Sequence, residues 1–107
     1  MYLRLIATAD LVLESEAPGH LEALGLDYKQ LRRARDGLIM VSMTPYGRHG
    51  PGATDPATDL TLLAGGGPVL MCGYDYHSLP PVRGGGNQAY NLGCHYAVLA
   101  ALTALFV

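Results

Sequence analysis

The chain has 107 residues, of which half are hydrophobic and 15% are charged, and its formal net charge is −2. This length and composition indicate one globular domain and exclude an intrinsically disordered protein. The small negative charge gives no electrostatic basis for binding nucleic acid or an anionic membrane, and we expect neither as a partner.

The helices and strands of the first part of the chain can be read in order. Residues 1–9 read as the end of a helix, and residues 11–13 are a short apolar run typical of a strand buried on both faces. After a turn, Pro18 suits the first position of the next helix, and Gly25 ends that helix.

A second short helix is predicted from residue 28 to about residue 35. Asp27 reads as its N-cap, and Gln30 three residues later completes a variant of the capping box. Residues 38–43 then form a second apolar strand. Two apolar strands joined by helices are typical of a parallel α/β fold, which is the fold class we expect.

The amino-acid composition changes after the second strand. Residues 44–57 are rich in glycine and proline and predict a long loop at the carboxyl end of the strand, where open α/β sheets bind ligands. Thr58 or Asp59 caps a short helix that runs through residue 64. Residues 65–87 are again predicted as loop.

The last segment predicts an apolar helix. Residues 97–107 form an almost wholly apolar run of 11 residues, too short for a membrane span of about 20, so we expect a buried helix. Its large side chains point around the whole circumference, and each one left in water forfeits roughly 1.5–3 kcal/mol. We therefore expect further segments or a second subunit to cover it. These side chains are Val98, Leu99, Leu102, Leu105, Phe106 and Val107.

Motifs for metals and phosphates are weak. Cys72 with His77, and Cys94 with His95, lack the spacing of metal ligands, so we expect no metal site. The glycines at 84–86 precede a helix but lack the residues of a P-loop, so a flexible turn remains the simpler interpretation. The small number of cysteines and the absence of a signal-peptide pattern predict a cytoplasmic location.

Taken in order, three segments resemble CoA-transferase family III, the CaiB/BaiF group that includes formyl-CoA transferase. They are ADLVLESEAPGHLEALGLDYKQLRRARDGLIMVSMTPYGRHGPG from Ala9, the pair Asp59-Leu60, and PPVRGGG at residues 80–86. The resemblance implies a Rossmann-like parallel sheet and an interlocked homodimer in the full-length protein. It also implies that residues 1–107 are one partial domain, incomplete at both ends.

The resemblance implies transfer of CoA from an acyl-CoA to a carboxylic acid, with CoA as a substrate and no further cofactor. In the family an Asp carboxylate attacks the thioester, which divides one difficult exchange into easier covalent steps. The matching position here is Ala89, and its neighbours Gln88, Tyr90 and Asn91 are not carboxylates either. No catalytic residue is therefore assigned.

Two alternatives remain open. In the first, the chain is part of a CoA-transferase whose activity is impaired or whose Asp comes from a partner subunit. In the second, it is a catalytically inactive paralogue that binds acyl-CoA or pairs with an active subunit. The related racemases are unlike this chain, because their His and Asp match Thr58 and Ala89. Glu16 replaces an aromatic residue of the family and adds a negative charge near the CoA phosphates.

The resemblance also implies which residues contact CoA. They lie in the turn after the first strand, in the loop after the second, and before the last helix. The predicted CoA contacts are Ser15, Pro18, Gly19, Tyr46, Gly47, Pro56, Asp59 and Gly85.

Overall fold

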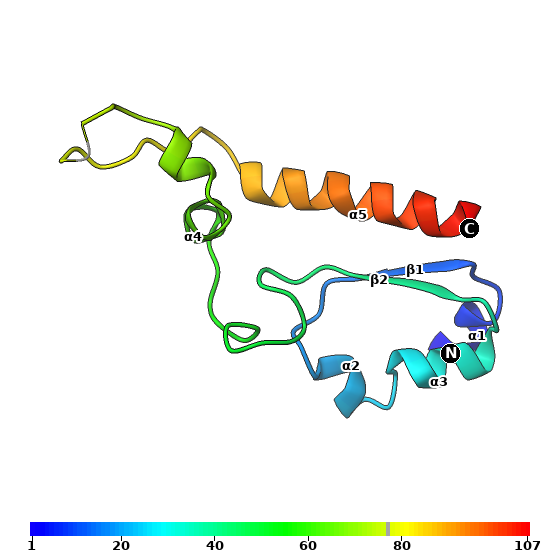
Figure 1. The fold of residues 1–107 in the computed structure, drawn as a ribbon. Helices are drawn as coiled ribbons and strands as arrows, with labels where there is room; N and C mark the ends of the chain where they lie inside the picture. Colours follow the sequence, from blue (N-terminus) through cyan, green and yellow to red (C-terminus); the bar gives the residue numbers. More distant parts are fainter. Residues whose placement is uncertain (77) are drawn as a thin grey trace.

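The structure, a computed structural model, describes residues 1–76 and 78–107. Its elements, in chain order, are α1 (Tyr2–Ile6), β1 (Leu11–Glu14), α2 (His20–Ala23), α3 (Tyr28–Ala34), β2 (Ile39–Ser42), α4 (Asp59–Gly65), the 3₁₀ helix η1 (Pro68–Met71) and α5 (Gln88–Phe106) (Figure 1). The predicted helices and strands are thus present. Only η1 falls where the sequence predicted loop.

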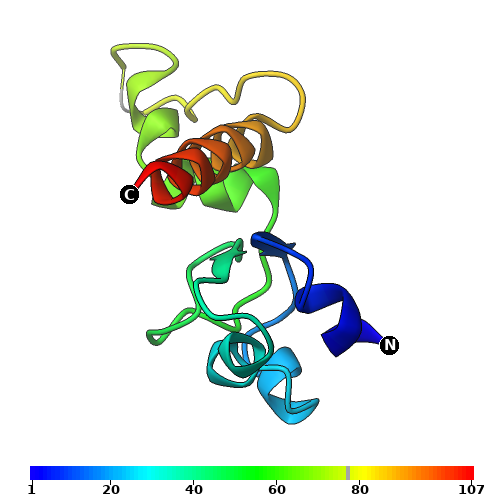
Figure 2. The ribbon, with the colours of Figure 1, turned by 90° about the vertical axis from the view of Figure 1, so that its right-hand side faces the viewer.

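The two strands form a parallel sheet, as predicted. Leu11 lies opposite Ile39, and Glu14 lies opposite Ser42. The helices α1, α2 and α3 lie on one face of this sheet, and α5 lies on the other (Figures 1 and 2). The mixed α/β fold class is therefore confirmed, whereas a larger Rossmann-like sheet stays a prediction.

The main core lies between the sheet and the helices α1 and α3. Leu31 and Leu38 are fully buried and pack with Ile6. Partly buried side chains surround this cluster, namely Val12, Leu26 and Met40. The cluster joins both short helices to the sheet.

Local caps explain why α2 and α3 end and begin where they do. Gly25 adopts a φ of 67°, its N–H donates to the Glu22 carbonyl, and the Leu26 N–H donates to the Leu21 carbonyl, which is a Schellman motif. The predicted stop at Gly25 is confirmed. Asp27 Oδ1 accepts a hydrogen bond of 2.8 Å from the Gln30 N–H, which confirms Asp27 as the cap of α3.

Three details of the sequence prediction are wrong. The helix α2 begins at His20 with Gly19 as its N-cap in the left-handed region, so Pro18 lies before the helix. Gln30 does not complete a capping box, because its Oε1 accepts from Arg33. The strand β1 is not buried on both faces, since the Leu13 side chain is 60% exposed in this two-stranded sheet.

Thr58, one of the two candidate caps, is the N-cap of α4. Its side chain accepts from the Thr61 N–H, and the Thr61 hydroxyl accepts from the Thr58 N–H, which completes a capping box. The Tyr46 hydroxyl donates to the same Thr61 oxygen over 3.0 Å. The loop after β2 is thereby attached to the start of α4.

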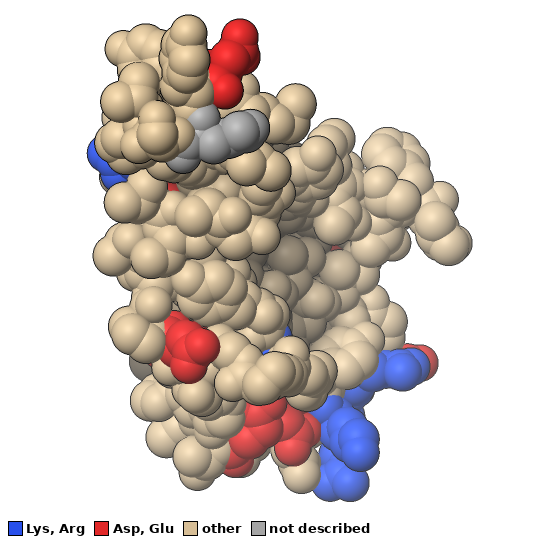
Figure 3. All heavy atoms as spheres, turned by 60° about the vertical axis from the view of Figure 1, so that its left-hand side comes forward, with Lys and Arg blue, Asp and Glu red and all other residues tan. Residues whose placement is uncertain are grey.

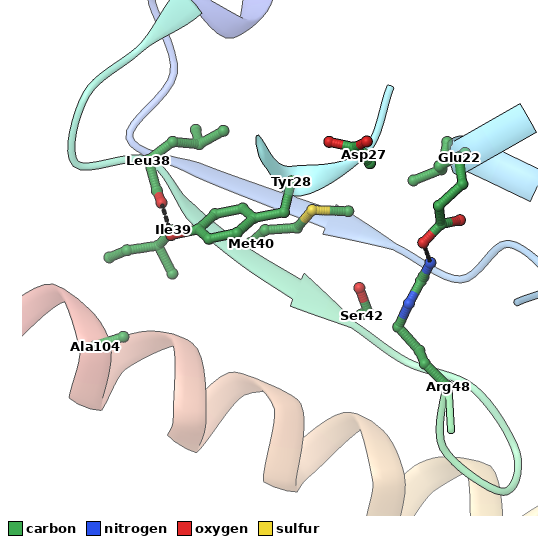
Figure 4. A pocket seen from close by; sticks show the side chains of 10 residues that line it. Glu22, Asp27, Tyr28, Leu38, Ile39, Met40, Ser42, Arg48 and Ala104 are labelled. Carbon is green, nitrogen blue, oxygen red and sulfur yellow. Dashed lines mark hydrogen bonds and ion pairs between the residues drawn. The ribbon is translucent and has the colours of Figure 1, made fainter. Parts of the chain in front are cut away.

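Arg48 attaches that loop to the sheet. Its guanidinium pairs with Glu14 at the end of β1 over 2.5 Å. It also pairs with Glu22 of α2 over 2.5 Å (Figure 4). The Glu14 side chain is only 5% exposed, and it also accepts from the Glu16 N–H over 2.8 Å. Hydrogen bonds from the backbone N–H of Glu22 and from Arg48 lower the pKa of the Glu22 carboxyl below 4.5.

The last helix is one continuous helix of 19 residues. It packs on β2 and α4, yet Ala101 is its only buried residue. No described segment of this chain covers the outer faces of α5, so burial of this helix by further segments or a second subunit stays a prediction. The exposed large side chains on it are Tyr90, Leu92, Tyr96, Val98, Leu99, Leu102, Leu105 and Phe106.

Within the described residues, α5 is long and apolar enough to cross a membrane by length and composition alone, with a mean hydropathy of 1.3. The helix is longer than the apolar run that the sequence analysis counted. Core helices of soluble proteins pass the same test, so this property does not distinguish a spanning helix from a covered one.

The molecule is extended. Its radius of gyration is 17.4 Å and its principal extents are 56 × 30 × 21 Å, whereas a compact domain of this length has a radius of gyration of about 13 Å. Much apolar surface consequently stays in water. On the face in Figure 3 the charged side chains gather mainly at the lower end, where α2 and α3 lie, with a few charged groups elsewhere on a mostly uncharged face.

Among the core side chains, truncation of Leu31 is expected to lower the free energy of unfolding most. Leu31→Ala removes a fully buried side chain and should lower the free energy of unfolding by about 2–5 kcal/mol. The matched control is Leu24→Ala, because the Leu24 side chain is 59% exposed. Urea unfolding followed by circular dichroism compares the two, and equal losses would contradict the assignment of the core.

The exposed faces of α5 should make the 107-residue chain self-associate. At micromolar concentration we expect sedimentation above the monomer mass of 11.3 kDa. Leu99→Lys with Phe106→Lys should shift the distribution toward monomer, whereas Leu24→Lys, outside α5, should not. A cooperative monomer of the unmodified chain would show that α5 needs no cover.

Acid should destabilise the fold through Glu22. Because its pKa is lower in the folded than in the unfolded chain, the carboxylate stabilises the fold fully above pH 4.5, and this contribution is lost as the pH falls through the folded pKa. As the pH is lowered below 4.5, the urea concentration at the unfolding midpoint should therefore fall less steeply in Glu22→Gln and Arg48→Met than in the unmodified chain. Arg32→Met, a change on α3, should leave the slope unchanged. An unchanged slope in Glu22→Gln would refute this role.

Candidate functional site

A cavity of about 890 Å³ lies between the carboxyl end of β2, α4 and the first turns of α5. The two strands are parallel, so the segments that leave them meet at one edge of the sheet, and the cavity opens there. Its walls are mainly apolar, including Val41, Met43, Leu62, Leu63 and Leu92.

The polar groups of the cavity come from the segments that leave β1 and β2. Ser15 follows β1, and Ser42, Thr44 and Arg48 come from the end of β2 and its loop. The hydrogen bond to Glu22 raises the pKa of the Arg48 guanidinium above its already high ordinary value, so this side chain stays a cation. The Thr44 hydroxyl is buried and has no hydrogen-bond partner among the described residues.

Ala89 lines the cavity from the first turn of α5. Its neighbour Tyr90 also lines the cavity, whereas Gln88 and Asn91 do not. The methyl group of Ala89 has neither a nucleophilic atom nor a proton to exchange. The cavity can therefore hold a ligand at this position but offers it no attacking carboxylate from residue 89.

The backbone of Ala89 is held by a carboxylate from another helix. Asp59 Oδ1 accepts a hydrogen bond of 2.7 Å from the Ala89 N–H, and Asp59 Oδ2 lies 3.5 Å from Arg83 Nη1. The Asp59 side chain is 4% exposed. α5 lacks a side-chain cap from its own N-cap residue, Asn87, and has no acidic residue in its first turn.

The structure brings some of the predicted CoA contacts together. Ser15 and Gly47 line the same cavity as Ala89. Tyr46 lies next to Gly47, but its hydroxyl is bonded to Thr61. The remaining predicted contacts are not among the residues that line the cavity, namely Pro18, Gly19, Pro56, Asp59 and Gly85.

Sequence reasoning missed the role of three side chains. Arg48 pairs with Glu14 and Glu22, and Arg83 pairs with Asp59, all far away in the chain. The sequence places both arginines in loops of the segments that resemble the family but does not identify these partners. Thr44 carries a hydroxyl directly after an apolar strand, and this position was a signal for a polar group in the cavity.

A second, smaller cavity of about 450 Å³ lies beside β2, between the start of α3 and α5 (Figure 4). Glu22, Tyr28, Arg48 and Ala104 line it, and the Tyr28 hydroxyl donates to the Leu38 carbonyl over 3.1 Å. Of its charged groups, Glu22 and Arg48 are paired with each other, and Asp27 caps α3 by accepting from the Gln30 N–H. The larger cavity, which contains Ala89, is therefore the candidate site.

Metal binding has no support in the described part of the chain. In residues 1–76 and 78–107, no group of three or more His, Cys, Asp or Glu side chains is placed to hold a metal ion. The pair of Cys72 and His77 is not tested, since His77 lies outside the described residues.

Known proteins resemble this chain along nearly its whole length. It is 42% identical over 106 residues to the BbsE subunit of succinyl-CoA:(R)-benzylsuccinate CoA-transferase from Thauera aromatica. The aligned region covers 99% of this chain and 25% of that relative. The chain therefore spans about a quarter of the length of this relative.

Two crystal structures share the fold. A hypothetical protein (Rv3272) from Mycobacterium tuberculosis superposes with a TM-score of 0.83 and 35% identity, covering 98% of this chain and 29% of that one. A CaiB/BaiF family protein from Brucella suis gives a TM-score of 0.80 and 31% identity, covering 98% and 27%. Since the family model for CoA-transferase family III also matches residues 1–107, the chain belongs to CoA-transferase family III.

Proposed function

We propose that this chain forms the acyl-CoA-facing part of a CoA-transferase subunit that cannot start the transfer of CoA by itself. The observation that carries this proposal is that Ala89, at the position of the family's nucleophilic Asp, lines the 890 Å³ cavity. Under this proposal the chain keeps a cavity for the acyl-CoA and lacks an attacking group at residue 89.

The chemistry of the family explains which reaction step is lost with alanine at position 89. An Asp carboxylate would attack the carbonyl carbon of the acyl-CoA thioester, the CoA thiolate would leave, and an acyl anhydride would form. The thiolate would then attack the aspartyl carbonyl carbon of this anhydride, which releases the first acid and leaves CoA on the enzyme as a thioester. The acceptor carboxylate would attack that thioester and expel the thiolate, and the thiolate would attack the acceptor's acyl carbon in the new anhydride, which frees the Asp carboxylate. Alanine provides no electron pair for the first step, so the sequence of steps stops before the anhydride.

The other residues of the cavity remain suited to holding a thioester. The apolar walls would exclude water from the acyl group and the pantetheine arm. The Thr44 hydroxyl, which has no partner among the described residues, would donate to a carbonyl or amide oxygen of a ligand that reaches it. We propose acyl-CoA and a carboxylic acid as substrates, with no further cofactor, in the cytoplasm.

A partner subunit would supply the missing carboxylate. The relative from Thauera aromatica is named as a subunit of its CoA-transferase, and its 42% identity makes a multi-subunit arrangement a suitable analogy for this chain. The uncovered faces of α5 provide apolar surface for such a partner. An interlocked homodimer of two identical chains is the alternative, and it would leave Ala89 in both sites.

The nucleophile can be tested by restoring it. In the full protein with its natural flanking sequence, the unmodified form should bind acyl-CoA without forming a covalent adduct. Ala89→Asp should give a trace of a hydroxylamine-sensitive CoA adduct by mass spectrometry, and Ala89→Asn, its uncharged match, should give none. We expect a trace because a positioning error of about 1 Å costs about 100-fold in rate.

Two outcomes would contradict this proposal. An adduct in the unmodified protein that disappears in Tyr90→Phe or Cys94→Ala would identify another nucleophile. A failure of the unmodified protein to bind acyl-CoA, by calorimetry at millimolar ligand, would remove the binding function itself.

A further inference from the structure

The start of α5 depends on a group outside the helix. The first N–H groups of a helix have no partner within it, and they are normally satisfied by a cap. Asn87 makes no side-chain cap, and no acidic side chain follows in the first turn of α5. Instead, the N–H of Ala89 donates to Asp59, a residue 30 positions earlier.

Asp59 is itself fixed from two sides. It is the first residue of α4, directly after the Thr58 cap, and it is buried. One carboxylate oxygen accepts from Ala89, and the other lies 3.5 Å from Arg83, three residues before the loop glycine Gly86. The carboxylate thus contacts both the loop that leads into α5 and the first turn of α5.

Asp59 is unsuited to act as a replacement nucleophile or as a CoA contact. It does not line the 890 Å³ cavity, and its side chain is 4% exposed. A carboxylate that already accepts a short hydrogen bond and faces a guanidinium is also a poor nucleophile, because those contacts stabilise its charge. Its Oδ2 is buried and accepts no hydrogen bond from the described residues, and Arg83 faces it as an ion pair at 3.5 Å.

We propose that Asp59 is the positioning residue of this site. By binding the N–H of residue 89 and facing Arg83, it fixes the first turn of α5 so that the side chain at position 89 points into the cavity. The contact uses the backbone of residue 89 and is therefore independent of which side chain stands there. The link to adduct formation, but not the contact itself, rests on the function proposed above.

Hydrogen exchange of single amides in the full protein tests the contact directly. Mass spectrometry with electron-transfer fragmentation resolves the Ala89 amide whether the protein is monomeric or associated. Asp59→Ala should speed exchange at Ala89 about tenfold or more, since a hydrogen bond to a charged group is lost. Asp59→Asn, which keeps an acceptor oxygen, should restore most of the protection, and Ala101 in the middle of α5 should change little.

Thr58→Ala is the matched control. It removes the capping box of α4 next to Asp59 but neither atom of the Asp59–Ala89 contact. Exchange at Ala89 should then stay close to that of the unmodified protein. Equal acceleration in Thr58→Ala and Asp59→Ala, or none in Asp59→Ala, would overturn the proposal.

The consequence for the site is measured in the Ala89→Asp background. Adding Asp59→Ala should lower the rate of CoA-adduct formation at least about tenfold while the dissociation constant for acyl-CoA changes less than about twofold. Adding Asp59→Asn should recover part of the rate. An unchanged rate in Asp59→Ala would refute positioning. If Ala89→Asp alone forms no adduct, the proposed function fails, and the exchange data still decide the role of Asp59.

Discussion

Parallel pairing of β1 with β2 is the constraint on which the other parts of the structure depend. A parallel partner can be reached only by crossing the sheet, so α2 and α3 must lie between the strands in sequence and pack on one face. The same pairing brings the ends of both strands to one edge. The serine after β1 and the loop after β2 therefore meet there, and α5 closes the cavity from the opposite face.

Two long-range charged contacts then give this edge its shape. Arg48 connects the loop after β2 with β1 and α2, and Asp59 connects α4 with the start of α5. Each uses a buried or nearly buried carboxylate, whose charge needs a specific partner in a site poor in water. The cavity is thus framed by fixed polar contacts and walled by apolar side chains, which suits a ligand with a long flexible arm.

The sequence could predict those features, such as helix caps, that depend on residues close together in the chain. Asp27, Thr58 and Gly25 act through backbone groups within a few residues, and their roles as caps were visible in the local pattern. The partners of Arg48 and Asp59 lie 34 and 30 residues away, and no local pattern specifies them. Pro18 misled because the chain passes through a left-handed conformation at Gly19, so α2 begins only at His20. The candidate site was therefore predictable in location but not in its contacts.

The double pairing of Arg48 implies an unequal response to ionic strength. Glu22 is about half exposed and its pair is open to screening by dissolved ions, whereas Glu14 is almost wholly enclosed and its pair is shielded from them. Added salt would therefore release the loop after β2 from α2 while leaving it attached to the end of β1. Arg48 would then remain bound to Glu14 alone, and α2 would move relative to the loop at salt concentrations that leave the sheet intact.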